Sequence, residues 1–250
     1  MKICAVQCRS KAGEVTANLQ RHQRFIRHAA DLGGDLVVFP ELSLTGYEPR
    51  LAKSLAMDDQ DLRFNVLEEC SRTRKIIIGV GLPLAKSAGI AESVQIGMIW
   101  FTPEGPRQIY AKQILHDDER PYFMPGDSQI LLDVGGFSMA PAICFESLQF
   151  DHAAAVSQSG ANVYLASVAK PQRGIDKAVL HYPAIARRHK MAVIMANSVG
   201  PSDNFLGAGQ SGAWNDQGHL VAQMDSDSEG IVIYDAITGS ADIWIAPQNL

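Results

Sequence analysis

Short apolar runs alternate with longer amphipathic stretches along the whole chain. The short runs are rich in Val and Ile, and several are continuous, which is typical of strands covered on both faces. We expect strands over residues 3–7, 36–39, 76–81, 93–101, 108–112, 137–144, 162–168, 193–197, 213–214, 220–224 and 231–234. The longer stretches carry apolar residues at helical spacing. They predict helices over residues 14–32, 61–73 and 175–190, and a further helix that begins near Glu146.

One pair of strands has the form of a hairpin, because the turn sequence TPEGP at 102–106 separates them. No linker, low-complexity segment or internal repeat divides the chain, so we expect a single domain over residues 1–250. Strand–helix alternation mixed with hairpins predicts an α/β fold built in layers. Two packed sheets with helices outside would accommodate this many strands, but the pattern by itself does not determine the topology.

Composition narrows the class of protein. Hydrophobic residues make up 46% and charged residues 20%, as in an ordinary soluble globular protein. The net charge is −5 with both signs mixed, and no basic stripe is present, so we expect neither a nucleic-acid partner nor a membrane one. Arg9 and Lys11 interrupt the first apolar run before it reaches the length of a signal-peptide core. No apolar stretch approaches the roughly 20 residues that span a bilayer, so a cytoplasmic protein is expected.

The cysteines separate into two groups. Cys4, Cys8 and Cys70 have spacings that match neither a zinc site nor a CxxC pair, and we interpret them as small buried hydrophobic residues. Cys144 follows a predicted strand and precedes a predicted helix. A helix N-terminus offers free N–H groups and a positive dipole, which would favour a thiolate and bind an oxyanion. The alternative is a buried structural cysteine.

Two charged residues also follow predicted strands. Glu41 comes directly after a buried strand and Pro40, at the sheet edge where α/β active sites form, and it is a candidate general base. Lys112 ends the second strand of the hairpin, where an ammonium could lower the pKa of a thiol and stabilise an oxyanion. A solvated loop acid and a surface edge-strand lysine are the respective alternatives.

Taken together in chain order, these motifs resemble the nitrilase superfamily of carbon–nitrogen hydrolases. The matching segments are Phe39-Pro40-Glu41 with Leu42, Gly46 and Tyr47; Lys112 and Leu115; Glu119, Tyr122, Phe123 and Gly126; Ile143-Cys144-Phe145-Glu146; Ala196-Asn197 with Gly200; and Gly209, Ser211 and Gly218. They cover nearly the whole chain. Many amidase-like relatives carry an arginine soon after the cysteine, but residues 147–150 contain none. Many also carry an Arg-Ala-x-Glu-Asn run before the late strand, where this chain has Ala-Arg-Arg-His-Lys at 186–190. For these reasons the substrate specificity of the relatives does not transfer directly.

The resemblance implies a four-layer α-β-β-α sandwich with Glu41 as general base and Cys144 as nucleophile. Lys112 and the backbone N–H of Phe145 would bind the tetrahedral oxyanion, and Glu119 would orient Lys112 or the substrate. A thioester on Cys144 would then be hydrolysed. The resemblance also implies at least a homodimer, and the reaction requires no metal or organic cofactor.

The expected function is therefore an amidase that acts on a small linear amide. Hydrolysis of an N-carbamoyl group and hydrolysis of a nitrile are the alternatives within the enzyme class, and an idle scaffold or a thiol-redox protein lies outside it. No synthetase region is present within these residues, which argues against a fused glutaminase, although a partner subunit served in trans stays open. Candidate substrate-binding residues are Tyr47, Tyr122, Phe145, Ser167 and Lys170.

Overall fold

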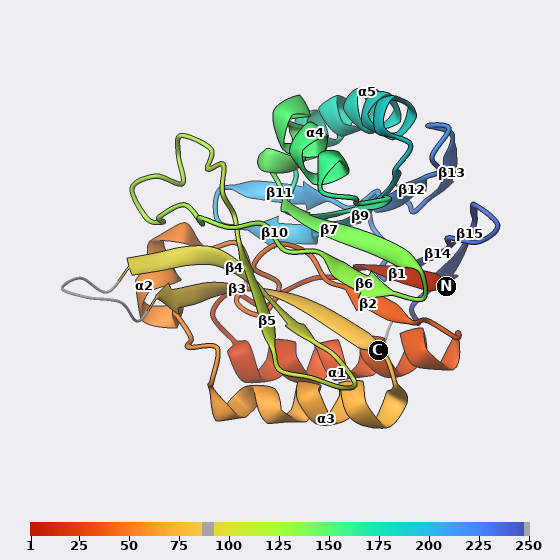
Figure 1. Cartoon of the computed structure of the whole chain (residues 1–250). Coiled ribbons are helices and arrows are strands. Elements are labelled where there is room, and N and C mark those ends of the chain that lie inside the picture. Colours follow the sequence, from red (N-terminus) through yellow and green to blue (C-terminus); the bar gives the residue numbers. More distant parts are fainter. Residues whose placement is uncertain (87–92, 248–250) are drawn as a thin grey trace.

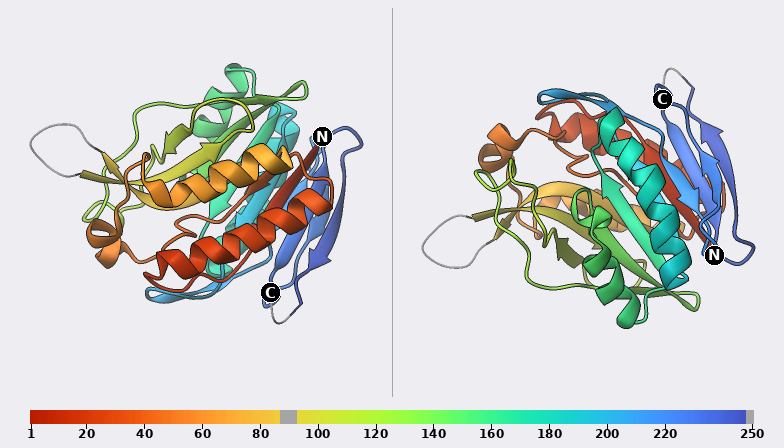
Figure 2. Two further views of the ribbon diagram at one scale, coloured as in Figure 1. Left: turned by 90° about the horizontal axis from the view of Figure 1, so that it is seen from below. Right: turned by 90° about the horizontal axis from the view of Figure 1, so that it is seen from above.

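Four layers make up the computed structural model, which describes residues 1–86 and 93–247. In Figure 1, helices α1 and α3 form the bottom layer, two sheets lie above them, and helices α4 and α5 form the top layer. Figure 2 shows the same arrangement from below and from above, with one helix pair across each outer face. The predicted α-β-β-α sandwich is confirmed.

The lower half contains a seven-stranded sheet in the order β15-β14-β1-β2-β3-β4-β5. The parallel neighbours β1, β2 and β3 are connected through helices, since parallel strands need a crossover connection. The bounds of this half are β1 (Lys2–Gln7), α1 (Val15–Asp31), β2 (Leu36–Val38), α3 (Asn65–Arg74), β3 (Ile77–Lys86), β4 (Ser93–Phe101), β5 (Gln108–Ala111), β14 (Gly230–Asp235) and β15 (Ser240–Ile245).

The upper half contains a six-stranded sheet in the order β13-β12-β9-β8-β7-β6. Strands β7, β8 and β9 are parallel, and helices connect them in the same way. Its bounds are β6 (Leu132–Val134), β7 (Phe137–Ile143), α4 (Phe150–Gln158), β8 (Val163–Val168), α5 (Gln172–His189), β9 (Ala192–Asn197), β12 (Gly212–Trp214) and β13 (Leu220–Gln223). A separate two-stranded sheet pairs β10 (Val199–Ser202) with β11 (Phe205–Ala208).

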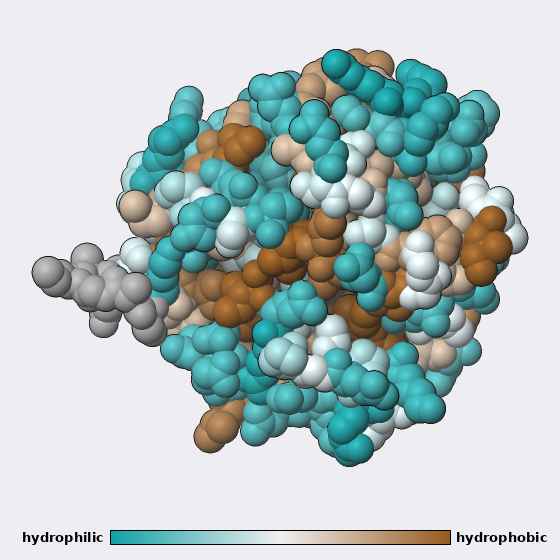
Figure 3. Space-filling view, in the orientation of Figure 1, coloured by the Kyte–Doolittle hydropathy of each residue, from teal (hydrophilic) through white to brown (hydrophobic). Residues whose placement is uncertain are grey.

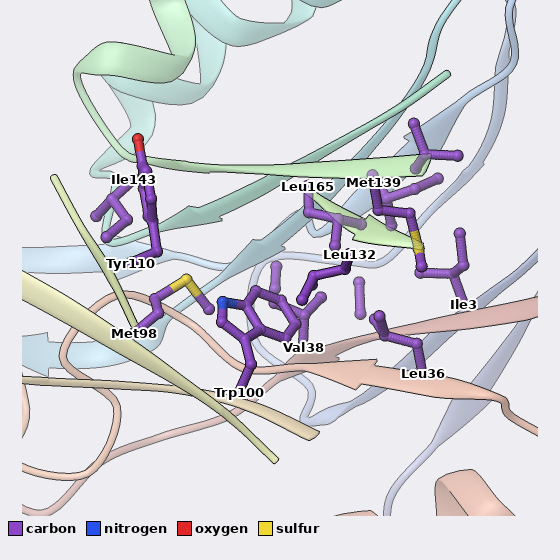
Figure 4. Packing of buried hydrophobic residues seen from close by; sticks show 14 of the residues in the cluster. Ile3, Leu36, Val38, Met98, Trp100, Tyr110, Leu132, Met139, Ile143 and Leu165 are labelled. Atoms are coloured by element: carbon purple, nitrogen blue, oxygen red, sulfur yellow. The ribbon is translucent and has the colours of Figure 1, made fainter. Parts of the chain in front are cut away.

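The central core lies between the two sheets. Figure 4 shows side chains from both sheets meeting there, with Trp100 and Met98 below and Leu165 and Met139 above. Two further apolar clusters lie under the helices, one on each outer side. Burial on both faces explains why the central strands are continuously apolar in sequence. Because parallel strands within each sheet end at the same edge, residues that follow them are brought together there.

Several predicted boundaries differ from the structure. The helix expected over 61–73 begins with the 3₁₀ turn η2 (Leu62–Phe64) and continues as α3. The helix expected near Glu146 is only the 3₁₀ turn η3 (Glu146–Leu148), and α4 starts at Phe150. Strands β6, β10, β11 and β15, the short helix α2 (Ala52–Leu55) and the 3₁₀ turn η1 (Pro49–Leu51) were not predicted. Strand β15 lies at the edge of its sheet and none of its residues is fully buried, so it lacks a strong apolar pattern.

The polarity of the exposed side chains differs between the helix layers and the sheets. Figure 3 shows mostly hydrophilic side chains over the helices and an apolar band across the middle of this face, at the height of the sheets. Among the described residues, none of the helices has both the length and the hydropathy needed to cross a membrane.

Candidate active site

Glu41 is held on a tightly packed loop after β2. The following residue, Leu42, adopts a positive φ of 53°, which is uncommon for a residue other than glycine. The loop packs directly on Gly81 of β3, where an added Cβ would lie 2.5 Å from the Leu42 nitrogen. From the other sheet, the Ser167 hydroxyl donates a 2.8 Å hydrogen bond to the carbonyl of Phe39. These contacts fix the carboxyl end of β2, and with it the position of Glu41.

Lys112 lies between two carboxylates. Its Nζ donates to Glu41 Oε1 at 2.9 Å and to Glu119 Oε1 at 2.6 Å, and the exposed fraction of its side chain is 0%. Burial alone would lower the pKa of Lys112, but the two carboxylates outweigh that effect and raise it. The surface edge-strand alternative for Lys112 is therefore wrong. Removing one partner of such a buried pair would leave an uncompensated charge, which is strongly destabilising.

Glu119 accepts several hydrogen bonds on the side of the cluster that faces the cavity. Besides Lys112, its Oε1 accepts a 3.0 Å hydrogen bond from the Tyr47 hydroxyl. Its Oε2 accepts a 2.8 Å hydrogen bond from the backbone N–H of His116. The carboxylate of Glu119 is thus fixed by three donors, and it holds the Lys112 ammonium in one orientation.

Cys144 lies at a strained turn directly after β7. Its φ is 48°, and its backbone N–H donates to the Ser167 carbonyl at 3.0 Å. A residue in this conformation projects its side chain away from the strand, and Cys144 lines the cavity described below. The backbone N–H of Phe145, the next residue, donates no hydrogen bond within the described part of the chain. It is free to bind an oxyanion beside the sulfur.

The protonation state of Cys144 differs from the expectation. Burial and the Glu41 carboxylate raise the pKa of the Cys144 thiol to about 11, although Lys170 and Lys112 act in the opposite direction. The predicted helix N-terminus is reduced to the turn η3, so it supplies little of the dipole that was expected to favour a thiolate. With this pKa the sulfur would be a thiol rather than a thiolate near neutral pH, so it would need a base in order to act as a nucleophile.

Glu41 has the properties of that base. Burial raises its pKa above the ordinary value, while the Lys112 ammonium and a hydrogen bond with the Cys144 side chain act to lower it. Its Oε1 is occupied by Lys112, whereas Oε2 is buried without a conventional hydrogen-bond partner among the described residues. A carboxylate with one anchored oxygen and one open oxygen beside a thiol is arranged to accept the proton of that thiol.

Glu146 is a site residue that the sequence analysis did not select. Its Oε1 accepts from the Ile143 N–H at 2.6 Å and the Tyr110 hydroxyl at 2.7 Å, and its Oε2 accepts from the Gln113 N–H at 2.8 Å. It therefore ties the turn of Cys144 to the segment that carries Lys112. Burial raises the pKa of Glu146 to about 6, against these hydrogen bonds. The available signal was the acid two residues after the cysteine.

A cavity of about 1360 Å³ opens beside Cys144. Of the predicted substrate contacts, Tyr47, Tyr122, Phe145 and Lys170 line it. Ser167 is not among the lining residues. It is fully buried in β8 and holds Phe39 instead, because its place in a strand between a sheet and a helix layer turns its side chain into the sandwich.

The remaining cysteines lie away from the cavity. Cys4 and Cys8 are buried in β1 and just after it, and burial raises the pKa of the Cys4 thiol to about 12. Cys70 is partly buried in α3. Across residues 1–86 and 93–247, no group of three or more His, Cys, Asp or Glu side chains is arranged to hold a metal ion.

The sequence is similar to those of known proteins. The family model described as carbon-nitrogen hydrolase matches residues 2–243. A glutamine-dependent NAD(+) synthetase from Rhodobacter capsulatus is 23% identical over 100% of this chain, which covers 46% of that protein. An (R)-stereoselective amidase from a Pseudomonas species is 27% identical over 82% of this chain and 74% of its own length. The chain thus spans less than half of the synthetase.

Solved structures show the same fold. An amidase from Nesterenkonia sp. AN1 superimposes with a TM-score of 0.84, covering 94% of this chain and 92% of that one at 21% identity. In a variant of that amidase, the active-site cysteine carries the acetamide moiety of fluoroacetamide. Since the family match extends over almost the whole sequence, the chain belongs to the carbon–nitrogen hydrolase family.

Proposed function

We propose that this enzyme is an amidase that hydrolyses a small linear amide through a thioester on Cys144. The observation that carries the proposal is the buried cluster in which Lys112 joins Glu41 and Glu119 next to the Cys144 thiol. A thiol with a raised pKa and a base with one open oxygen suit nucleophilic attack on a carbonyl carbon. The likeness to two amidases supports this choice.

In the proposed reaction, Glu41 takes the proton of Cys144 as the sulfur attacks the amide carbonyl. The Lys112 ammonium and the Phe145 N–H donate to the oxyanion, where preorganised donors act most strongly. Glu41 then gives its proton to the leaving nitrogen, and the C–N bond breaks to release ammonia. A water molecule, deprotonated by Glu41, hydrolyses the thioester to a carboxylic acid and restores the thiol. The covalent step divides one difficult displacement into two easier ones.

A substrate panel tests the proposal. Purified enzyme is incubated with short aliphatic amides, N-carbamoyl amino acids and short nitriles, and released ammonia is measured. We expect turnover of amides with the highest kcat/KM, and no turnover of any amide in Cys144→Ala. Preferred hydrolysis of carbamoyl compounds or of nitriles would replace the amidase assignment by that alternative. A protein without turnover in any class would leave the idle-scaffold alternative.

Glutamine is a second candidate substrate. Its support is that seven of the curated relatives are named glutamine-dependent NAD(+) synthetases, over less than half of their length. The ammonia from glutamine would then serve a second reaction that consumes ammonia. The same assay decides the matter: a kcat/KM for glutamine above that for acetamide or propionamide would favour this role.

We also propose that the enzyme is a homodimer through its upper helix layer. The segment 150–158 carries alanines and a valine among few charges, but Ala153 and Val156 of that segment are buried inside the subunit. The better support is a set of exposed apolar side chains on α4 and α5, with Leu180 79% and Phe150 43% exposed. Light scattering at micromolar concentration is expected to give twice the mass of the chain, and a monomer mass would contradict the proposal.

A further inference from the structure

Lys170 is a second buried lysine at the nucleophile. It follows β8, and its Nζ lies 3.2 Å from the Cys144 carbonyl oxygen and 3.8 Å from the Cys144 sulfur. The residue is 3% exposed and lines the cavity. A buried lysine normally requires a carboxylate partner, because an unpaired ammonium is costly to remove from water. Within the described ranges, Lys170 has no such ion pair, so its charge is available to the sulfur and to the cavity.

Hydrogen bonds to the backbone and packing against α5 fix the position of Lys170. The Asn197 side chain accepts from the Lys170 backbone N–H at 2.8 Å and donates to its carbonyl at 3.2 Å. The Lys170 stem then passes over Gly174 in the first turns of α5. A Cβ at Gly174 would lie only 3.1 Å from the Lys170 Cβ and 3.3 Å from its Cγ. These neighbours leave one path for the side chain, which ends at Cys144.

The charges of the catalytic cluster leave a place for a second cation. Lys112 is shared between Glu41 and Glu119, so a single positive charge faces two carboxylates. When Glu41 takes the proton of Cys144, a negative charge appears on the sulfur while Glu119 stays ionised. Lys112 balances only one of these two charges. A second ammonium 3.8 Å from the sulfur balances the other.

We propose that Lys170 is a second catalytic cation, which stabilises the Cys144 thiolate as it forms and attacks. This inference rests on the proposed role of Cys144 as the nucleophile. The two lysines would then have separate roles: Lys112 pairs with the base and stabilises the oxyanion, and Lys170 stabilises the negative charge on the sulfur. The charge of Lys170 also explains why a thiol placed so close to Glu41 and Glu119 can ionise during the reaction.

The other titratable groups around the sulfur do not replace Lys170. Glu41, Glu119 and the hydroxyls of Tyr47 and Tyr182 face it from the neighbouring loops and from α5, and none of them is a cation. Lys112 does favour the thiolate, but Lys170 contributes more to lowering the pKa of Cys144. On the cavity side, burial and, to a smaller extent, the charge of Lys170 lower the pKa of His181.

The test is the alkylation rate of Cys144 in Lys170→Gln, measured by mass spectrometry of the modified peptide between pH 7 and 9. Glutamine removes the charge but can still donate to the Cys144 carbonyl. An opposite charge at this distance typically shifts a pKa by about one unit or more, so we expect the rate with neutral iodoacetamide to fall roughly tenfold or further. Anionic iodoacetate should slow as well. The kcat for a neutral amide should fall with the alkylation rate, at nearly constant KM.

Three further variants sharpen the result. Lys170→Arg keeps the charge and should recover most of the alkylation rate, while Lys177→Met removes a cation from the same cavity wall, and its rate should stay within about twofold of wild type. Lys170→Met carries the same expectation as Lys170→Gln and takes its place if Lys170→Gln melts before the assay temperature. An iodoacetamide rate within twofold of wild type in the charge-free variant would overturn the proposal. A loss confined to iodoacetate would also overturn it, because Lys170 would then serve a substrate carboxylate.

Alkylation needs no turnover, so it separates this inference from the proposed amidase function. Wild-type enzyme that reacts with iodoacetamide yet releases no ammonia from any amide would refute the proposed function alone. The comparison of wild type with Lys170→Gln would still decide the role of Lys170.

Discussion

Glu41→Gln is the sharpest perturbation of the proposed chemistry. Glutamine keeps the shape of the side chain and an oxygen that can accept from Lys112, which is 2.9 Å away in the wild type. Lys112 also keeps its 2.6 Å hydrogen bond to Glu119, so the buried ammonium remains paired. The substitution therefore removes the base with little disturbance of the packing.

The magnitude follows from the pKa of the nucleophile. With a Cys144 pKa of about 11, only about one thiol in 10⁴ is ionised at pH 7. Removal of Glu41 also removes a charge that raises this pKa, so part of the thiolate is regained. A positioned general base typically contributes about 10²–10⁴. We expect kcat/KM for a short amide to fall about 10³-fold in Glu41→Gln, which is roughly 4 kcal/mol of transition-state stabilisation.

The pH profile provides an independent check. In the proposed mechanism Glu41 acts in its ionised form. Because burial is the main cause that raises the pKa of Glu41, wild-type activity should be lost as the pH falls through that raised value. In Glu41→Gln the attacker is thiolate formed by solvent, and kcat/KM should rise up to about tenfold per unit between pH 7 and 9. Asp118→Asn, at an exposed acid of the same cavity, is the matched control and should stay near wild type. Retention of more than a tenth of the activity, or a flat profile from pH 7 to 9, would refute Glu41 as the base.

Three further outcomes are expected. Cys144→Ala should abolish ammonia release with an unchanged circular dichroism spectrum, while alanine at each of the other three cysteines should retain activity; turnover in Cys144→Ala would exclude it as the nucleophile. Lys112→Met should lower kcat about 100- to 1000-fold. Because it leaves two carboxylates buried without their cation, it should also lower the free energy of unfolding, measured in urea, by about 3–5 kcal/mol. Near-normal values of both quantities would contradict the proposed role of Lys112. His22, which is buried and contacts Asn18 and Ser43, has a pKa lowered by burial to about 4. Since the folded state disfavours its protonation, this histidine costs stability as the pH falls from its unfolded pKa towards 4. The stability advantage of wild type over His22→Gln should therefore shrink by about 2–3 kcal/mol between pH 7 and 4.5, and a constant difference would show that His22 does not titrate in this way.

Much of the layered fold could be predicted from the apolar pattern. Continuous runs such as residues 36–39 and 76–81 correspond to strands buried on both faces, and the period of residues 14–32 corresponds to an amphipathic helix. These are local properties, because a strand or helix must present its apolar side chains to a core wherever that core lies. Edge strands such as β15, in which no residue is fully buried, carry no such pattern and were not predicted.

The candidate catalytic residues were also visible in sequence, since Glu41, Lys112 and Cys144 each follow a strand. Their protonation states could not be predicted from the sequence. The sequence suggested a thiolate at a helix N-terminus, whereas the structure has a neutral thiol after a strained turn. Charge state depends on burial and on the sum of neighbouring charges, and these come from segments up to about 100 residues away along the chain.

Lys170 illustrates the same division. In sequence Lys170 is one cation among many, and it was predicted only as a substrate contact. Only the tertiary structure places its ammonium 3.8 Å from the Cys144 sulfur, over Gly174 and without an acidic partner among the described residues. Ser167 shows the opposite: it was predicted to contact the substrate, but it is buried and its hydroxyl donates to the Phe39 carbonyl of the other half of the sandwich. The residue types and their order along the chain determine which chemistry is available, but the distances that put it to use arise where two sheets meet, and no local pattern encodes them.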